Sequence, residues 1–237
     1  MSFVPDANRL IHYGPTAFPP LAVAADIVVL AAGSTGLHVL MAKRPAQPYR
    51  GKYALPGVLL QAEEALDDAA DRAVATKVGL RANVRQFGAF GAVDRDPRMR
   101  VVSIGYAALV PWRHLEAGLG ADQQLCRIDG SVVRDRNGRK LSLPFDHDEI
   151  VQTAVQYLRG DLDHSLWSFG LLEAEFTLRE LQEVHEAVRS RTVNKPAFRK
   201  RLLDSGKLEA TGRLETGSKF RPAELYRVRQ EWRDGER

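Results

Sequence analysis

Residues 54–80 read ALPGVLLQAEEALDDAADRAVATKVGL, and this stretch decides the fold of the N-terminal part of the chain. A loop marked by Pro56 and Gly57 leads into residues 64–78, which are rich in alanine and contain neither glycine nor proline. Gly79 follows at once, and glycine is the residue most often found just past the end of a helix. The pattern therefore predicts a helix over 64–78 that ends at this glycine.

Strand-like apolar runs surround this predicted helix. They cover residues 27–30, 37–41, 85–93 and 100–110. The turn Gly33-Ser34-Thr35-Gly36 between the first two runs predicts a β-hairpin, and Asn137-Gly138 predicts a second one further along. Asp146 and Glu149 then have the spacing of a capping box, so a helix with one apolar face is expected to follow. Residues 1–160 are therefore expected to form an α+β domain that closes near Gly160.

Residues 58–80 resemble the Nudix box when they are anchored on Glu64, Arg72 and Gly79. That box runs Gly, five residues, Glu, seven residues, Arg-Glu, an apolar residue, any residue, Glu-Glu, any residue, Gly and an apolar residue. In this chain Val58 stands at the first glycine. The three later glutamates fall on Ala73, Thr76 and Lys77.

The three replaced glutamates decide the expected chemistry. Positions i, i+3 and i+4 of a helix share one face, and glutamates there gather oxygen ligands for magnesium, which bridges phosphates and activates water. Alanine and threonine cannot replace a carboxylate, and Lys77 carries a positive charge. The acidic residues that remain, such as Asp67 and Asp71, lie earlier in the helix, where they complement its dipole. We expect no catalytic residue and no metal site.

Three further motifs resemble one branch of the Nudix superfamily, the Nudix-related transcriptional regulators of NAD metabolism. They are Lys43-Arg44-Pro45, the stretch 49–57 (YRGKYALPG) and the stretch 94–103 (DRDPRMRVVS). The similarity extends from about Ile27 to Val228. It implies a Nudix-like mixed-sheet domain that binds ADP-ribose as an effector, with no cofactor. It also implies a repressor of NAD biosynthesis or salvage genes that ADP-ribose releases from operator DNA.

A pocket for a pyrophosphate needs cationic groups and backbone donors near an apolar wall. The chain offers nine candidate ligand-binding residues: Arg44, Arg50, Lys52, Tyr53, Lys77, Asp94, Asp96, Arg98 and Arg100. Tyr49 or Tyr53 is expected to stack on adenine. Lys77 is expected to compensate phosphate charge in the place of a metal.

Positive charge gathers in the last quarter of the chain. Residues 176–237 hold fifteen Lys and Arg against ten Asp and Glu, whereas residues 1–175 hold nineteen against twenty. Such asymmetry favours a polyanion as the partner of this segment, with a solvated basic surface as the alternative.

This basic segment has the pattern of a winged helix-turn-helix. Thr177 and Glu180 form a capping box, and apolar residues follow at helical spacing. Asn194 is an N-cap for a second helix over 195–204, and two helices joined by so short a turn predict helix-turn-helix. Strand-like residues then flank a polar loop over 212–222, which predicts a wing. The ending at 221–227 (RPAELYR) resembles the same regulators.

A helical wheel of the second helix places Phe198, Leu202 and Leu203 on an apolar arc. Lys200 and Arg201 fall on the opposite side, suited to a major groove. Arg199 falls within the apolar arc and is expected to pack. The candidate DNA-binding residues are Thr177, Arg191, Asn194, Lys195, Lys200, Arg201, Arg213, Lys219 and Arg221.

The whole chain has the composition of a globular protein, with 44% hydrophobic and 27% charged residues. Its longest apolar stretch, 21–32, contains Asp26 and is too short to cross a bilayer. The N-terminus has no signal-peptide pattern, so we expect a cytoplasmic protein without a membrane partner. The single cysteine, Cys126, excludes an internal disulfide.

We therefore expect three segments. They are a Nudix-like ligand-sensing domain over 1–160, a linker helix over 161–175 and a winged helix-turn-helix DNA-binding domain over 176–237. The expected protein binds double-stranded operator DNA as a homodimer. Two alternatives stay open: a working ADP-ribose pyrophosphatase, and a module whose winged helix binds protein.

Overall fold

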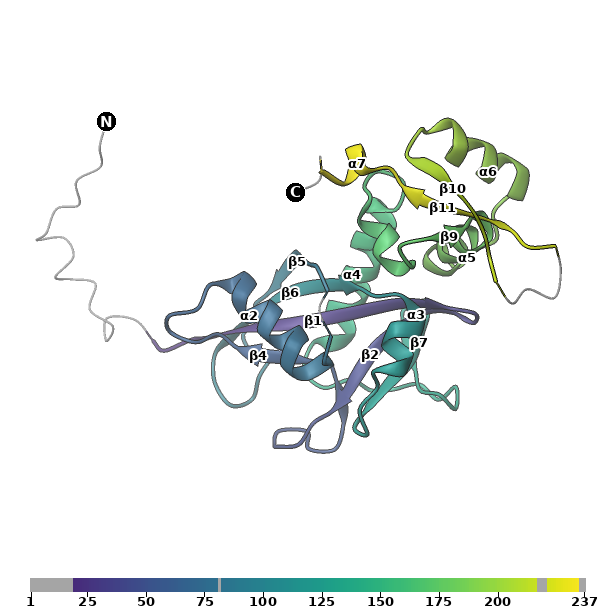
Figure 1. The fold of residues 1–237 in the computed structure, drawn as a ribbon. Helices are drawn as coiled ribbons and strands as arrows, with labels where there is room; N and C mark the ends of the chain where they lie inside the picture. Colours follow the sequence, from purple (N-terminus) through teal and green to yellow (C-terminus); the bar gives the residue numbers. More distant parts are fainter. Residues whose placement is uncertain (1–18, 81, 217–220, 235–237) are drawn as a thin grey trace, which may run out of the picture.

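The computed structural model describes residues 19–80, 82–216 and 221–234. A mixed sheet with helices on both faces is followed by a smaller helical domain that has its own three-stranded sheet (Figure 1). The expected α+β fold with a C-terminal winged helix-turn-helix is confirmed. None of the helices in these described ranges is long and apolar enough to span a membrane.

Strand β1 (Ala22–Gly33) lies at the centre of the large sheet. It pairs in parallel with β6 (Val101–Leu109) and antiparallel with β2 (Gly36–Lys43), which makes the sheet mixed. The remaining strands are β3 (Tyr53–Ala54), β4 (Gly57–Leu59), β5 (Val84–Phe90), β7 (Gln123–Asp129) and β8 (Val132–Arg134). The order is β5-β6-β1-β2-β7-β8, with β3 added to β2 and β4 to β1. The predicted hairpin is confirmed, with Gly33 opposite Gly36.

The two faces of β1 belong to two cores, which explains its continuous apolar sequence. Val28 and Leu30 pack on one face, and Ile27 and Val29 pack on the other. Cys126 is fully buried in the first core, where burial raises the pKa of its thiol to about 12 and keeps it protonated.

Helix α2 (Leu66–Ala73) covers the second core and continues into a π-helical turn, η2 (Val74–Val78). The turn ends at Gly79, whose φ of 79° is left-handed, so the predicted glycine stop is confirmed. Alanines at the sheet-facing positions of α2 allow the helix to lie close to the strands. Val58 lies in β4, an extended segment that suits a β-branched residue.

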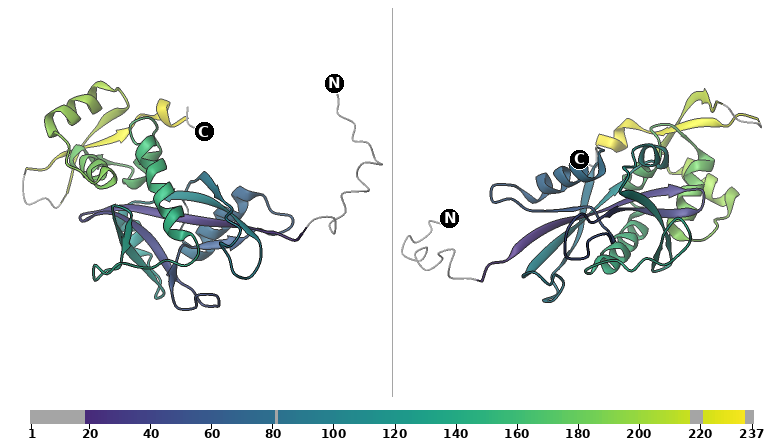
Figure 2. Two further views of the ribbon diagram at one scale, coloured as in Figure 1. Left: turned by 180° about the vertical axis from the view of Figure 1, so that it is seen from behind. Right: turned by 90° about the horizontal axis from the view of Figure 1, so that it is seen from below.

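Helix α4 (His147–Asp161) crosses the other face of the sheet and reaches the C-terminal domain (Figure 2). The capping box expected for it is wrong. Asp146 occupies the N-cap position, but its carboxylate accepts two hydrogen bonds from Arg95 instead of bonding the helix amides. Helix α3 (Trp112–Ala117) lies near the end of the β1–β2 hairpin.

The linker helix expected over 161–175 is also wrong. In the described chain this segment forms only a short 3-10 helix, η3 (Trp167–Leu171). Ser165 accepts the Trp167 amide and donates to Asp161, a local side-chain bond that competes with regular helix. Leu166, Trp167, Leu171 and Leu172 are all buried, so the irregular path turns apolar side chains inward. The domain limits at 160 and 176 stay a prediction.

The C-terminal domain contains the predicted helix-turn-helix. Helix α5 (Leu178–Arg189) begins with the capping box of Thr177 and Glu180. Helix α6 (Lys195–Asp204) begins at Asn194, whose side chain accepts the Ala197 amide. Its other elements are β9 (Phe176–Thr177), β10 (Leu208–Leu214), β11 (Glu224–Val228) and α7 (Gln230–Asp234). The sheet order β10-β11-β9 is that of a wing packed against the helices.

Candidate ligand pocket and nucleic-acid interface

A cavity of about 170 Å³ lies where β1, β4 and the loop after β5 meet the N-terminal end of α4. Its wall consists of Ala24, Asp26, Arg44, Leu55, Gly57, Val58, Leu59, Arg95, Asp96, Arg98, Val101, Phe145 and His147. Apolar residues and charged groups of both signs therefore line one small space, as in many ligand sites.

The floor of this cavity is a buried ion cluster. Arg95, whose side chain is 3% exposed, donates to both carboxylate oxygens of Asp146 at 2.7 Å. It also donates to Asp26 at 3.3 Å, and the Ser103 hydroxyl donates to the same carboxylate at 2.6 Å. Paired and hydrogen-bonded in this way, the buried charges are compensated, and they fix the geometry of the pocket.

His147 completes the floor. Its Nδ1 accepts the Leu55 amide at 3.0 Å, and its Nε2 lies 3.9 Å from Asp26. Burial lowers the pKa of His147, so the ring is neutral near pH 7 and carries its proton on Nε2. Gly57 is required beside it, because a Cβ there would lie 2.4 Å from the Asp26 carboxylate.

The rim of the cavity carries two guanidinium groups. Asp96 accepts two hydrogen bonds from the Arg98 side chain, at 3.0 and 2.8 Å, and one from its amide. The side-chain bond to Arg98 holds the pKa of Asp96 below its usual value. Arg44 donates to the Pro48 carbonyl and lies 4.8 Å over the Phe145 ring. Burial, and then repulsion by Arg98, lower the pKa of Arg44, so an anion between the two arginines would be favoured.

The structure brings three of the nine predicted ligand residues, Arg44, Asp96 and Arg98, to this cavity. The other six predicted ligand residues do not line this cavity. They are Arg50, Lys52, Tyr53, Lys77, Asp94 and Arg100. Arg100 donates to the carbonyls of Gly91 and Ala92 and so shapes its own loop. Tyr53 packs against the core, which leaves its ring half-buried.

The sequence reasoning missed three residues that line the pocket, Asp26, Arg95 and His147. It also missed the ion pair by which Asp146 holds Arg95. Asp26 alone gave a readable signal, because a carboxylate inside the apolar run 21–32 must be buried with a partner.

The box positions on α2 and η2 lie elsewhere. Glu64 binds the Arg72 side chain at 2.6 and 2.7 Å, so the one aligned glutamate holds a structural ion pair. Ala73 is fully buried, whereas Thr76 and Lys77 are exposed on the π-turn. Within the described residues, no group of three or more His, Cys, Asp or Glu side chains is placed to hold a metal ion.

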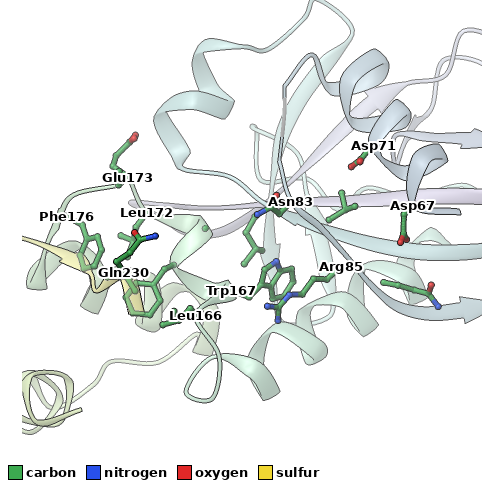
Figure 3. A pocket seen from close by; sticks show the side chains of 17 residues that line it. Asp67, Asp71, Asn83, Arg85, Leu166, Trp167, Leu172, Glu173, Phe176 and Gln230 are labelled. Atoms are coloured by element: carbon green, nitrogen blue, oxygen red, sulfur yellow. The ribbon is translucent and has the colours of Figure 1, made fainter. Parts of the chain in front are cut away.

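A larger cavity of about 1090 Å³ separates the two domains along one side. Figure 3 places Asp67 and Asp71 at one end and Phe176 and Gln230 at the other, with Trp167 between them. The domains are therefore not packed together over their whole facing surfaces.

A basic cavity of about 230 Å³ marks the helix-turn-helix. It is lined by Arg189, Arg191, Val193, Asn194, Ala197, Phe198 and Arg201. Three guanidinium groups thus meet the N-terminus of α6, where free amides and the helix dipole favour a phosphate. Arg189 was not among the predicted residues.

The remaining predicted DNA-binding residues fall into three groups. Lys195, Lys200, Arg213 and Arg221 are exposed, with Lys200 paired to Asp204 and Arg213 to Glu175. Thr177 is 3% exposed and its hydroxyl serves the capping box, so its role in this structure is to begin α5. Lys219 lies outside the described residues. Arg199 is half-buried, as the helical wheel predicted, but Leu203 of the same apolar arc is 49% exposed, so that part of the wheel is wrong.

Comparison with known domain families gives two matches. The model of the NUDIX domain matches residues 20–125, and the model of the NrtR DNA-binding winged helix domain matches residues 168–228.

Individual relatives agree with this division. The chain is 29% identical to the ADPR responsive transcriptional repressor NtrR of Acinetobacter baylyi over 96% of its own length and 90% of the relative. It is 30% identical to the ADP-ribose pyrophosphatase of Methanocaldococcus jannaschii over 52% of its own length and 68% of that protein. The crystal structure of Shewanella oneidensis NrtR complexed with a 27mer DNA superposes with a TM-score of 0.76 and 26% identity, covering 87% of this chain and 93% of that one.

Proposed function

The chain belongs to the family that joins a NUDIX domain to an NrtR winged helix DNA-binding domain, and we propose that it is a transcriptional repressor whose hold on DNA is controlled by ADP-ribose. The observation that carries the proposal is the pairing of two anion-binding surfaces in one chain. One is the small pocket rimmed by Arg44 and Arg98, and the other is the basic cavity at the start of α6.

The second surface supports binding to duplex DNA. In a helix-turn-helix the second helix enters the major groove, and its N-terminal residues reach base edges. Lys195, Lys200 and Arg201 are exposed on α6, and Arg213 and Arg221 are exposed on the wing. The relative of known structure that superposes over most of this chain was solved with DNA.

The first surface supports ADP-ribose as the effector. We propose Arg44 and Arg98 as the groups that bind its pyrophosphate, because Asp96 holds the Arg98 side chain and the Arg44 guanidinium lies over the Phe145 ring. The Acinetobacter relative is described as ADPR responsive, and the Methanocaldococcus relative acts on ADP-ribose by its name.

A pyrophosphatase is the alternative, because the Methanocaldococcus enzyme is similar over the NUDIX domain. Ala73, Thr76 and Lys77 argue against it, since none of them supplies the carboxylates of the hydrolytic box. We therefore expect no release of AMP when the protein is incubated with ADP-ribose and magnesium. Turnover at about 1 s⁻¹ or faster, an ordinary enzyme rate, would contradict the proposal that the protein is a regulator without hydrolase activity.

The regulated genes are proposed to be those of NAD biosynthesis or salvage, and the binding unit a homodimer on a nearly palindromic operator. Two-fold symmetric regulators place their recognition helices about 34 Å apart or a multiple of it. Footprinting combined with size-exclusion chromatography tests this. One isolated half-site occupied by a single chain would rule it out.

The central experiment is a fluorescence anisotropy titration of duplexes from such promoters, with and without ADP-ribose. We expect a dissociation constant of about 10⁻⁸ M or tighter for an operator, as for other specific regulators. ADP-ribose should weaken this binding, and AMP at the same concentration serves as the control anion. Equal affinity for an unrelated duplex of the same length would contradict the proposal.

A further inference from the structure

We infer that α4 couples the ligand pocket to the DNA-reading helix, and that Arg159 and Asp163 at its C-terminal end are the residues that position that helix. The inference rests on the proposed function and adds a route for the regulation. It follows from the contacts at the two ends of one helix.

The N-terminal end of α4 belongs to the pocket. Asp146, directly before the helix, holds Arg95, and His147, its first residue, bonds the Leu55 amide. Arg95 and His147 both line the cavity, and Phe145 lies under the Arg44 guanidinium. A ligand that moves Arg44 or Arg95 therefore acts on the first turn of α4.

The body of α4 is able to transmit such a movement. It is one uninterrupted helix of 15 residues, which spans about 22 Å at 1.5 Å per residue. Ile150, Ala154 and Leu158 are fully buried against the sheet on one face of the helix. Close-packed helices shift as rigid elements, because their interiors do not deform continuously.

The C-terminal end of α4 is hydrogen-bonded to the helix-turn-helix. Arg159 donates to the Val188 carbonyl at 2.7 Å and to the Ser190 hydroxyl at 3.1 Å. Ser190 ends α5 with a left-handed φ of 53°, and the turn to α6 begins immediately after it. Arg159 therefore holds the start of the turn that leads from α5 to the recognition helix α6.

Asp163, two residues past α4, binds both helices of the motif. Its carboxylate pairs with Arg189 on α5 and lies 3.5 Å from Arg201 on α6. His185 Nδ1 lies 3.8 Å from the same carboxylate. Arg189 and Arg201 also line the basic cavity, so one connector carboxylate orients two of its three guanidinium groups.

Another region of the domain junction contains the large cavity. There the cavity of about 1090 Å³ separates α2 and β5 from Phe176, Val228 and Gln230 (Figure 3). Helix α5 does also pack near the β1–β2 hairpin, and this hairpin is the rival route. The two routes can be told apart by experiment. Substituting Arg159 or Asp163 removes the polar contacts of the α4 route and leaves the hairpin unchanged.

The test measures a coupling factor, the ratio of the dissociation constants for operator DNA with and without saturating ADP-ribose. A wild-type factor of about 100 corresponds to about 2.7 kcal/mol, within the usual range of allosteric coupling. We expect Arg159→Ala and Asp163→Asn each to reduce the factor at least about tenfold. ADP-ribose binding by the DNA-free protein should stay within about twofold of wild type. Arg179→Ala is the matched control, since Arg179 forms its ion pair with Glu183 on the exposed face of α5.

The outcomes separate the inference from the proposed function. No effect of ADP-ribose on wild-type DNA binding would overturn both. A wild-type effect that persists unchanged in the two variants would overturn the α4 route alone and leave the repressor standing. Asp163→Asn keeps the shape of the side chain, so it reports on coupling even if Arg159→Ala unfolds. Arg159→Lys, which retains one donor, should recover part of the factor.

Discussion

The two basic surfaces of this chain hold their charges in opposite ways. In the pocket, Arg95 is 3% exposed and shared between two carboxylates, and Arg98 is fixed by Asp96. On the helix-turn-helix, the side chains of Lys200 and Arg201 are 78% and 58% exposed. The floor of the pocket therefore holds its charges in buried ion pairs, whereas the DNA surface exposes its charges to solvent.

This difference matches the partners that we propose. A small ligand gains affinity from groups that are held in place before it arrives, because less ordering remains to be done on binding. A DNA backbone is a regular line of phosphates, and exposed lysines and arginines bind it largely through the release of counterions.

Arg95→Ala should have the largest effect. Removing Arg95 leaves Asp26 and Asp146 buried without their cation, and breaking a buried pair in this way costs about 3–5 kcal/mol. We expect that loss in the free energy of unfolding, measured by urea denaturation. Arg98→Ala is the control, since the Arg98 side chain is 49% exposed and should change stability by less than about 1 kcal/mol. Equal stabilities would mean that the floor of the pocket is not fixed by charge.

The double variant Arg44→Ala, Arg98→Ala should abolish the response to ADP-ribose while leaving DNA binding intact. Each hydrogen bond to a charged group contributes about 1.5–3 kcal/mol, so the pair predicts at least about a hundredfold weaker ligand binding. Isothermal titration calorimetry gives the affinity, and anisotropy follows release from DNA. Release at the wild-type ligand concentration would show that this pocket is not the sensor.

Lys200→Ala and Arg201→Ala should each weaken DNA binding about tenfold. Both side chains are exposed on the recognition helix, and a lost phosphate contact also lowers the slope of log affinity against log salt by about 0.9. A salt titration of both variants measures the two quantities together. Wild-type affinity and slope in both variants would remove α6 from the DNA surface and favour a protein partner.

A pH dependence of stability is expected from His185 in the core of the helix-turn-helix. Burial lowers the pKa of His185 to about 4, whereas an unfolded histidine titrates near 6.5. Between these values only the unfolded chain binds the proton, so the free energy of unfolding should fall as the pH drops from about 6.5 to 4, by at most about 1.4 kcal/mol per pH unit. His185→Leu should flatten this slope. His114→Ala should not, because His114 is 61% exposed. If the free energy of unfolding depends on pH with the same slope in both variants, His185 is not the source of that pH dependence.

Local patterns predicted most of the fold. The β1–β2 hairpin, the glycine stop at Gly79 and the capping box at Thr177 depend on neighbours in sequence, and all three are confirmed. The capping box at Asp146 failed because its partner, Arg95, lies 51 residues away in the chain. A motif of four residues carries no information about such a competitor.

The candidate site was predictable only in part, for the same reason. Arg44, Asp96 and Arg98 belong to quoted motifs, and the structure brings them to one cavity. Arg100 belongs to the same stretch, but it turns to its own loop carbonyls. Which of two nearby arginines reaches a pocket depends on backbone direction, and charge and spacing do not encode that direction.

The π-turn at the end of α2 has a consequence for anyone who would engineer this chain into a hydrolase. The register of η2 differs from that of an α-helix, so positions 73, 76 and 77 no longer repeat at the spacing that gathers ligands on one α-helical face. Ala73 is fully buried, and a glutamate there would place its charge among apolar side chains. We therefore expect glutamates restored at positions 73, 76 and 77 to destabilise the second core without recovering magnesium-dependent hydrolysis. Urea denaturation and an assay for AMP release would measure the two effects.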